Sequence, residues 1–188
     1  MKIHQFPLIC IVIILSGLCL TACAKELSGP KIKEPNNQNK MNISSPNFEN
    51  SALIPPDFTC QGNGFSPELH ISEIPAHTVS LALIMEDPDA PNPPWTHWVM
   101  WNIPPETTII PKNVGTSFAV QGNNSWPQKG YGGPCPPSGT HRYFFKLYAL
   151  TKELNLPDTA TREDLLKAME GLIIEEDQYM GIVRKTGS

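Results

Sequence analysis

The 188-residue sequence predicts one mainly β domain behind an N-terminal targeting segment. Three apolar runs of strand length support this prediction: Ser80–Glu86, Thr96–Ile103 and Arg142–Leu150. The composition agrees with it, because 20 prolines and 13 glycines favour turns and loops over long helices. The length suffices for a substantial core, and the net charge of −4 excludes a general nucleic-acid-binding surface.

Residues 1–22 have the pattern of a lipoprotein-type signal peptide. A basic start at Lys2 precedes an apolar run over 6–20, and the small-residue site Leu-Thr-Ala-Cys ends at Cys23. This site resembles a bacterial lipobox, so Cys23 is the expected lipidation site. The alternatives are an ordinary signal peptide with a chance cysteine, or an uncleaved anchor, for which the run is short against a span of about 20 residues.

A lipid on Cys23 would anchor the protein without crossing the membrane. We therefore expect an exported, lipid-anchored protein of the cell envelope, at the periplasmic face of a bacterial membrane or at the cell surface. Residues 23–40 contain mostly Lys, Glu, Pro, Asn and Gln, which predicts a flexible tether. Residues 41–188 form the predicted domain.

Within the domain, short strands are expected over 41–48 and 54–58, where prolines interrupt the apolar pattern. The near-continuous apolar run from Ser80 to Glu86 is typical of a strand covered on both faces. Trp98 and Trp101 are three residues apart on a strand, so they should point to opposite faces, with at least one in the core. Trp95, among prolines, is expected at the mouth of a pocket.

One helix is expected near the C-terminus. Thr161 can cap it, with Asp164 three residues on as a variant of the capping box. Gly171 stands where a C-terminal glycine belongs. The apolar stripe consists of Leu165, Leu166 and Met169. A last strand is predicted over 173–184, despite its cluster of acidic residues.

Two polar stretches adjoin the predicted central strands. One begins at Asp87 and leads to His97, and the other is a Gly/Pro-rich run that ends at His141 and Tyr143. They supply a carboxylate, two imidazoles and backbone N–H groups, which together suit a small anion pocket. A nearby carboxylate raises the pKa of an imidazole, so we expect both histidines to be protonated when an oxyanion is bound.

Simpler interpretations exist for each of these residues. A lone histidine is more often a hydrogen-bonded core residue, and an aspartate before proline commonly caps a turn. We assign the turn role to Asp89 and the pocket role to Asp87. Arg142 is expected to pair with one of these two carboxylates rather than with a ligand.

The motifs resemble those of the phosphatidylethanolamine-binding protein family, and most closely its bacterial and archaeal Raf kinase inhibitor-like branch. The motifs are Asp-Pro-Asp-Ala-Pro at 87–91, His-Trp at 97–98, Gly-Pro-Cys-Pro-Pro at 133–137 and His-Arg-Tyr at 141–143. The resemblance implies a PEBP-like antiparallel β-sandwich, with one or two short helices and an anion pocket at one end. The ligand-binding residues that it implies are Asp87, His97, Pro136, Pro137, His141 and Tyr143.

The favoured function is a binding protein for small anionic or phosphorylated ligands, with phospholipid headgroups among the candidates and no cofactor. The alternative is an inhibitor or regulator of a protein partner such as a protease. An enzyme ranks third: Asp87, His97 and His141 superficially form the ligand set of a non-haem iron site, yet the sequence contains no recognisable nucleophile or metal-binding motif. The sequence identifies no protein partner and leaves a homodimer open.

Cys60 and Cys135 are the two cysteines that remain in the predicted domain. In an exported protein they can form a disulfide or stay as two reduced thiols, because sequence does not supply their Cα separation. We predict that they lie close enough to be bridged.

The lipobox interpretation predicts that Cys23→Ser abolishes lipidation and releases the protein from the membrane fraction. Fractionation of cells expressing each form, with mass spectrometry of the N-terminus, measures both effects. A Ser variant that stays membrane-bound and unprocessed would instead identify the segment as an uncleaved anchor.

Overall fold

The computed structural model describes residues 40–185. The predicted signal peptide, the lipidation site Cys23 and the predicted tether up to residue 39 lie outside the described residues. Within residues 40–185, no helix has both the length and the hydrophobicity that a membrane crossing requires.

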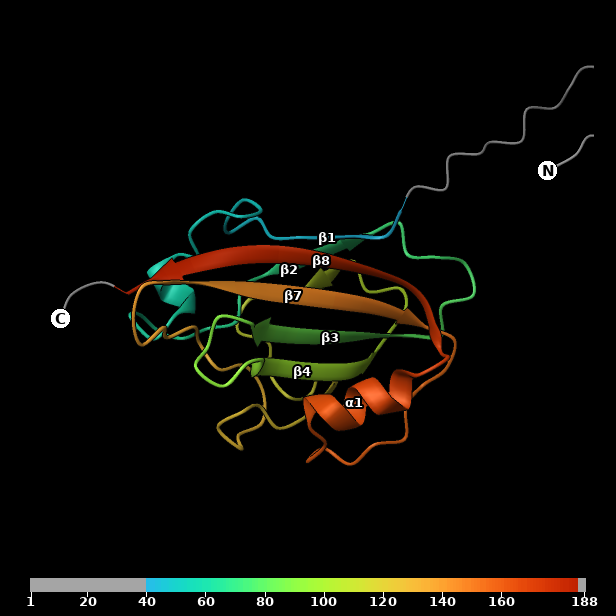
Figure 1. The fold of residues 1–188 in the computed structure, drawn as a ribbon. Coiled ribbons are helices and arrows are strands. Elements are labelled where there is room, and N and C mark those ends of the chain that lie inside the picture. Colours follow the sequence, from blue (N-terminus) through green and yellow to red (C-terminus); the bar gives the residue numbers. More distant parts are fainter. Residues whose placement is uncertain (1–39, 186–188) are drawn as a thin grey trace, which may run out of the picture. The chain divides into compact units, whose positions relative to one another are not determined.

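Two antiparallel sheets make up the fold, which confirms the predicted mainly β class (Figure 1). In the three-stranded sheet the order is β1 (Asn42–Ser44), β2 (Leu69–Ser72) and β5 (Ile109–Ile110). In the five-stranded sheet the order is β6 (Val120–Gln121), β4 (Trp95–Ile103), β3 (Ser80–Asp87), β7 (Thr140–Leu150) and β8 (Ile173–Arg184).

Strand β3 lies at the centre of the larger sheet and is buried along its whole length. Leu81 and Leu83 belong to the main core, whereas Ala82 and Ile84 belong to a second apolar cluster on the opposite face. Trp98 and Trp101 divide between the same two clusters, and both are fully buried. The prediction of opposite faces is confirmed, and both rings are core residues because both faces of the sheet are covered.

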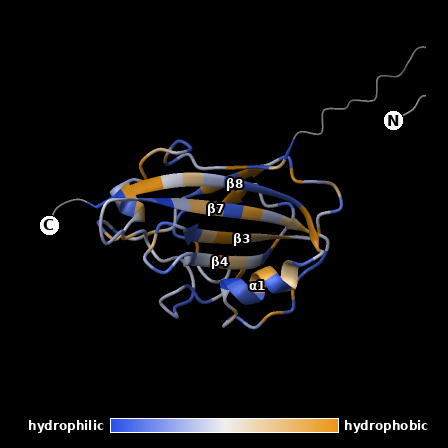
Figure 2. Cartoon of the chain, viewed as in Figure 1, coloured by the Kyte–Doolittle hydropathy of each residue, from blue (hydrophilic) through white to orange (hydrophobic). Residues whose placement is uncertain are grey.

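Helix α1 (Arg162–Met169) packs onto the second cluster through Leu165 and Met169. Thr161 accepts a hydrogen bond from the backbone N–H of Asp164, and the Asp164 carboxylate accepts one from the backbone N–H of Thr161, so the predicted capping box is present. In Figure 2 the ribbon of the helix carries both hydrophilic and hydrophobic residues, as expected of a helix that covers a sheet.

The segment over 54–58 does not form the predicted strand. It contains the 3-10 helix η1 (Pro56–Phe58), in which the N–H of Phe58 donates to the carbonyl of Pro55. Pro55 and Pro56 lack the N–H groups that a sheet ladder requires, which explains the difference. The strand expected over 41–48 shortens to β1, and β2, β5 and β6 were not predicted.

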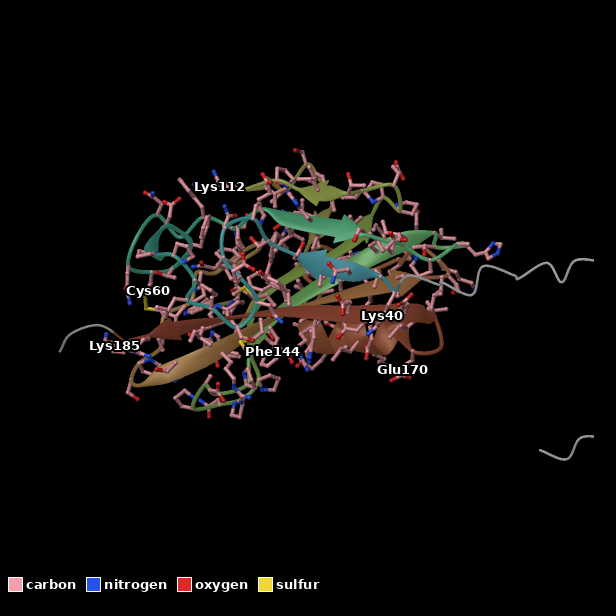
Figure 3. All side chains as sticks on the ribbon, turned by 90° about the horizontal axis from the view of Figure 1, so that it is seen from above. Lys40, Cys60, Lys112, Phe144, Glu170 and Lys185 are labelled. Atoms are coloured by element: carbon pink, nitrogen blue, oxygen red, sulfur yellow. A yellow bond between two sulfur atoms is a disulfide. The ribbon has the colours of Figure 1, made fainter. Side chains whose placement is uncertain are left out.

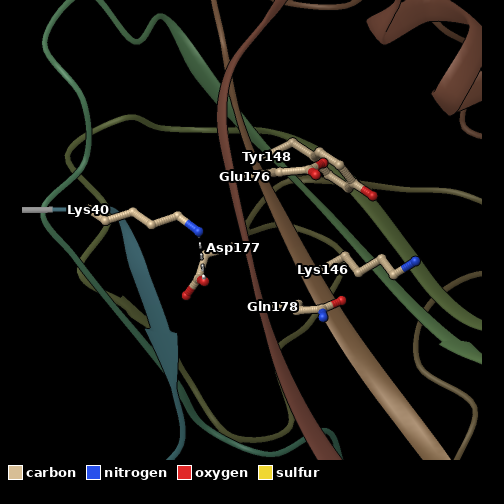
Figure 4. A pocket seen from close by; sticks show the side chains of 6 residues that line it. All are labelled: Lys40, Lys146, Tyr148, Glu176, Asp177 and Gln178. Carbon is tan, nitrogen blue, oxygen red and sulfur yellow. Dashed lines mark ion pairs between the residues drawn. The ribbon is translucent and has the colours of Figure 1, made fainter.

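The acidic cluster of β8 connects the two sheets. The Glu175 carboxylate accepts a hydrogen bond from the N–H of Met41 (3.0 Å), and Asp177 accepts one from the N–H of Ile43 (2.9 Å). Lys40 adds an ion pair to Asp177 at 3.9 Å, drawn as a dashed line in Figure 4. The acidic residues of β8, which are unusual in a strand, therefore hydrogen-bond the backbone at the start of β1 and connect it to the edge of the larger sheet.

Cys60 and Cys135 are joined by a disulfide, with their Cα atoms 5.4 Å apart. The bridge links the loop after η1 to the Gly/Pro-rich stretch that precedes β7. Figure 3 labels Cys60 at the same end of the domain as Lys185, with Lys40 and Glu170 toward the other end.

Peptide mapping without reduction should recover Cys60 and Cys135 in one linked species. Because the bridge spans 75 residues, the double variant Cys60→Ser/Cys135→Ser should lose about 4 kcal/mol of unfolding free energy in the loop-entropy description. Urea unfolding with and without reductant measures this loss. Reductant should destabilise the wild type and leave the double variant unchanged, and a wild type indifferent to reductant would contradict the bridge.

Candidate ligand-binding site

Three strand termini meet at one end of the larger sheet. Strand β3 ends at Asp87, and its antiparallel neighbours β4 and β7 begin at Trp95 and Thr140 (Figure 1). The loops that follow or precede these termini enclose a cavity of about 230 Å³. The residues that line it are Asp87, Ala90, Pro91, Trp95, His97, Trp126, Cys135, Pro137 and Tyr143.

The structure brings most of the predicted site residues to this cavity. Asp87, His97, Pro137 and Tyr143 line it directly. His141 is buried and does not line the cavity, but its Nδ1 contacts Asp87, which does. Pro136 is also buried but is not part of the lining, and its contact with a ligand stays a prediction.

Asp87 is 3% exposed, and both of its carboxylate oxygens are hydrogen-bonded. Oδ1 accepts from the backbone N–H of Asp89 at 2.8 Å, and Oδ2 accepts from Nδ1 of His141 at 2.7 Å. The sequence analysis assigned the turn-capping role to Asp89, but Asp87 has this role. Asp87 also faces the cavity, as predicted. The cap explains why the chain turns directly after the buried strand.

Asp89 instead forms an ion pair with Arg142. The Arg142 guanidinium donates to both oxygens of Asp89, from Nε at 2.9 Å and from Nη2 at 2.8 Å. These bonds lower the pKa of Asp89 to about 2. Arg142 therefore has the structural role expected of it, and its charge is directed to Asp89 rather than to the cavity.

His97 is 2% exposed, and its Nδ1 lies 2.7 Å from the carbonyl oxygen of Gly132. A carbonyl only accepts, so Nδ1 carries the proton and the neutral ring keeps Nε2 as an acceptor. Burial lowers the pKa of His97 to about 4, and it outweighs the raising effects of the Gly132 carbonyl and of Asp87. Asp87 acts on this pKa in the expected upward direction, but the net shift is downward, because desolvation of a ring this deep is the larger effect.

Tyr143 is fully buried, and its hydroxyl has no hydrogen-bond partner within the described part of the chain. Burial, the negative charge of Asp87 and the closeness of that carboxylate to the hydroxyl raise the pKa of Tyr143 well above the ordinary value, so the hydroxyl keeps its proton. Asp87 is thus the nearest acceptor, although its geometry falls short of a regular hydrogen bond. An unsatisfied buried hydroxyl costs about 1–3 kcal/mol. A ligand oxygen in the cavity would satisfy it.

Trp126 is a wall residue that the sequence did not identify. Its ring packs edge-on against Trp95 and His97, with ring centroids 5.3 and 5.1 Å apart. The preceding Ser125 fixes the loop, since it donates its N–H to the Thr96 carbonyl and accepts the Thr96 N–H, both at 2.9 Å. A Cβ at Gly132 would lie 2.5 Å from the Trp126 ring, so glycine is required there. The only sequence signal was a tryptophan beside proline in a loop.

A second cavity, of about 240 Å³, lies at β7 and β8, away from these strand termini. Figure 4 shows its lining: Lys40, Lys146, Tyr148, Glu176, Asp177 and Gln178. Lys146 and Asp177 are already paired with Glu86 and Lys40. No orphaned buried polar atom of the described residues belongs to this lining, so the first cavity is the stronger candidate. Among residues 40–185, no group of three His, Cys, Asp or Glu side chains could hold a metal ion.

Comparisons with known proteins identify relatives of this chain. A sequence profile of the family described as phosphatidylethanolamine-binding protein matches residues 44–184. A UPF0098 protein of Methanothermobacter thermautotrophicus is 46% identical over 150 residues, covering 77% of this chain and 99% of that protein. A UPF0098 protein of Chlamydia pneumoniae is 44% identical over 152 residues, covering 78% and 100%.

Solved structures show the same fold. A crystal structure from Chlamydia trachomatis, described as a homologue of phosphatidylethanolamine-binding protein, matches with a TM-score of 0.76 and 40% identity over 79% of this chain and 99% of that one. YbcL of E. coli, described as a new member of the mammalian PEBP family, matches with a TM-score of 0.74 and 27% identity over 78% and 99%.

The buried neutral His97 should make the protein sensitive to acid. Its pKa is about 4 in the folded state and about 6.5 when unfolded, so the unfolded chain binds more protons between these values. The contribution of neutral His97 to the free energy of unfolding is fully present above pH 6.5. It is lost as the pH falls toward 4, and the loss amounts to about 3 kcal/mol. Urea unfolding from pH 7.5 to 4.5, in chloride without added oxyanion, measures the slope.

His97→Gln should flatten this part of the pH dependence, whatever its effect on stability at pH 7. His77→Gln is the matched control, because His77 is exposed in a loop, and it should retain the wild-type slope. Equal slopes in all three proteins would show that His97 is not held neutral by burial.

Proposed function

Because the chain belongs to the phosphatidylethanolamine-binding protein family, we propose that it binds small anionic or phosphorylated ligands in the cavity beside Asp87, His97 and Tyr143. The observation that carries the proposal is the Tyr143 hydroxyl, which is buried at the cavity and has no partner among the described residues. A hydroxyl that keeps its proton is a ready donor to a ligand oxygen.

The size of the cavity limits the ligand. At about 230 Å³ it falls below the roughly 300–1,000 Å³ of typical pockets for drug-sized molecules. It suits a phosphoryl group with a small substituent, such as the headgroup end of a larger molecule, rather than a whole lipid. Trp95 and Trp126 supply apolar walls against which such a substituent can pack.

The position of the cavity is compatible with the lipid anchor that we propose at Cys23. Lys40, where the described domain begins, is labelled toward the end opposite Cys60 (Figure 3). Cys60 is bonded to Cys135 of the cavity wall. The described domain therefore begins toward the end opposite this part of the cavity wall.

Tyr143→Phe should weaken binding of inorganic phosphate by about tenfold, since it removes one hydrogen bond worth about 1–1.5 kcal/mol. Calorimetric titration of the purified full chain measures the change. Tyr148→Phe is the matched control, because it removes a hydroxyl from the second cavity, and its affinity should equal that of the wild type. Loss of binding in Tyr148→Phe alone would place the anion site at the second cavity.

A further inference from the structure

The larger sheet leaves part of one face without a covering layer. On β7 and β8, residues such as Phe145 and Tyr179 point into the main core, so the alternate residues point to the outer face. Helix α1 packs on that outer face through the second apolar cluster, which includes residues of β3, β4 and the end of β7. Figure 1 shows β7 and β8 with no element in front of them, and α1 on the β4 side. The outer face of β7 and β8 is thus open to a partner.

Apolar side chains occupy the middle of this outer face. Phe144 of β7 is paired with Met180 of β8, and Ile182 follows two residues on; all three are only partly buried. Leu53, which forms a bridge to Ile182 from the neighbouring segment, is 56% exposed. A contiguous group of accessible apolar side chains is typical of a protein contact.

Opposite charges lie at equal distances from this apolar middle. On β8, Glu176 lies four residues before Met180 and Arg184 lies four residues after it, so all three point to the outer face. Both charged side chains are exposed, and neither forms an ion pair with another residue in the described part of the chain. At about 3.3 Å per residue, each charge lies about 13 Å along the strand from Met180.

This pattern is complementary to itself under a two-fold rotation. An axis that crosses the strands at Met180 lays β8 of a second copy antiparallel over β8, so Glu176 of each copy faces Arg184 of the other. An axis along the strands would instead place each of these charges against its own like, which is repulsive. The charges therefore select the antiparallel arrangement.

We propose that the outer face of β7 and β8 is the contact between two copies of this chain, in a symmetric dimer centred on Met180 and Phe144. Arg184 of each copy enters the second cavity of the other, where Glu176 and Tyr148 lie. Phe144 packs against its counterpart at the axis. This interface is separate from the anion site, and it requires no ligand.

The size of the face sets the strength of the dimer. Nine residues of β8, with β7 on one side and the segment of Leu53 on the other, cover roughly 30 Å by 14 Å. This area is smaller than the roughly 800 Å² that each partner buries in a standard interface. The dimer is therefore weak and reversible, with a Kd of about 10–100 μM.

Crosslinking across the two-fold axis tests the dimer on the purified full chain. Packed sheets lie about 10 Å apart, so the two thiols introduced by Met180→Cys lie within reach of a short bis-maleimide and should be joined into a covalent dimer. His77→Cys is the matched control, because His77 is exposed in the loop between β2 and β3. It should crosslink no faster than the wild type, which measures any reaction of the native cysteines.

Charge exchange tests the antiparallel arrangement in the Met180→Cys background. Glu176→Arg and Arg184→Glu should each lower the initial crosslinking rate about tenfold, because each change replaces two attractions of the symmetric dimer with two repulsions. The double variant Glu176→Arg/Arg184→Glu restores opposite charges and should recover the original rate. Glu170→Arg makes the same charge change at an exposed residue after α1, and it should leave the rate unchanged.

Each outcome decides the proposal. A Met180→Cys protein that crosslinks no faster than His77→Cys would overturn the dimer. Single charge variants without effect, or a double variant as slow as the single ones, would overturn the antiparallel contact. Urea unfolding midpoints equal to that of the wild type verify that the variants are folded, as expected for substitutions of exposed side chains. Slow single variants with a restored double variant support the dimer as described.

Discussion

The candidate site depends on the residue that ends β3, a strand whose two faces are both buried. Asp87 is the last residue of β3 and is 3% exposed, and a buried carboxylate is costly unless donors satisfy it. The Asp89 N–H and His141 supply those donors from the turn after β3 and from the start of β7. Arg142, next to His141, then holds the Asp89 side chain. One buried carboxylate therefore fixes two segments that are more than fifty residues apart.

The opposite wall of the cavity is fixed by the backbone of the Gly/Pro-rich loop. The N–H of Gly132 donates to the His97 carbonyl at 2.8 Å, and its own carbonyl accepts from the His97 ring. Three residues later the disulfide joins Cys135 to Cys60, whose N–H donates to the Pro134 carbonyl at 3.0 Å. The loop is thus bound to β4 on one side and to the loop after η1 on the other, and this sets the ring orientation of His97.

Sequence predicted those elements whose signals are local and strong. The strand over 80–86 is a continuous apolar run, and α1 carries its own cap in Thr161 and Asp164. By contrast, β2 is four residues with only two buried, and β5 and β6 have two residues each. Strands this short form because a partner is present, not because of their own composition. The acidic cluster in β8 was ambiguous for the same reason, since its partners are the N–H groups of Met41 and Ile43.

In the site, too, local motifs predicted which residues come together, whereas their protonation depends on contacts that the motifs do not specify. Antiparallel pairing places Asp87, His97 and Tyr143 at one sheet end, where they line the same cavity, and the sequence motifs had grouped them as candidates. The protonation of His97 depends on its burial beneath Trp126 and beside Tyr143, which no motif specifies. Burial removes the positive charge that an imidazolium would have offered to an anion and leaves an acceptor in its place.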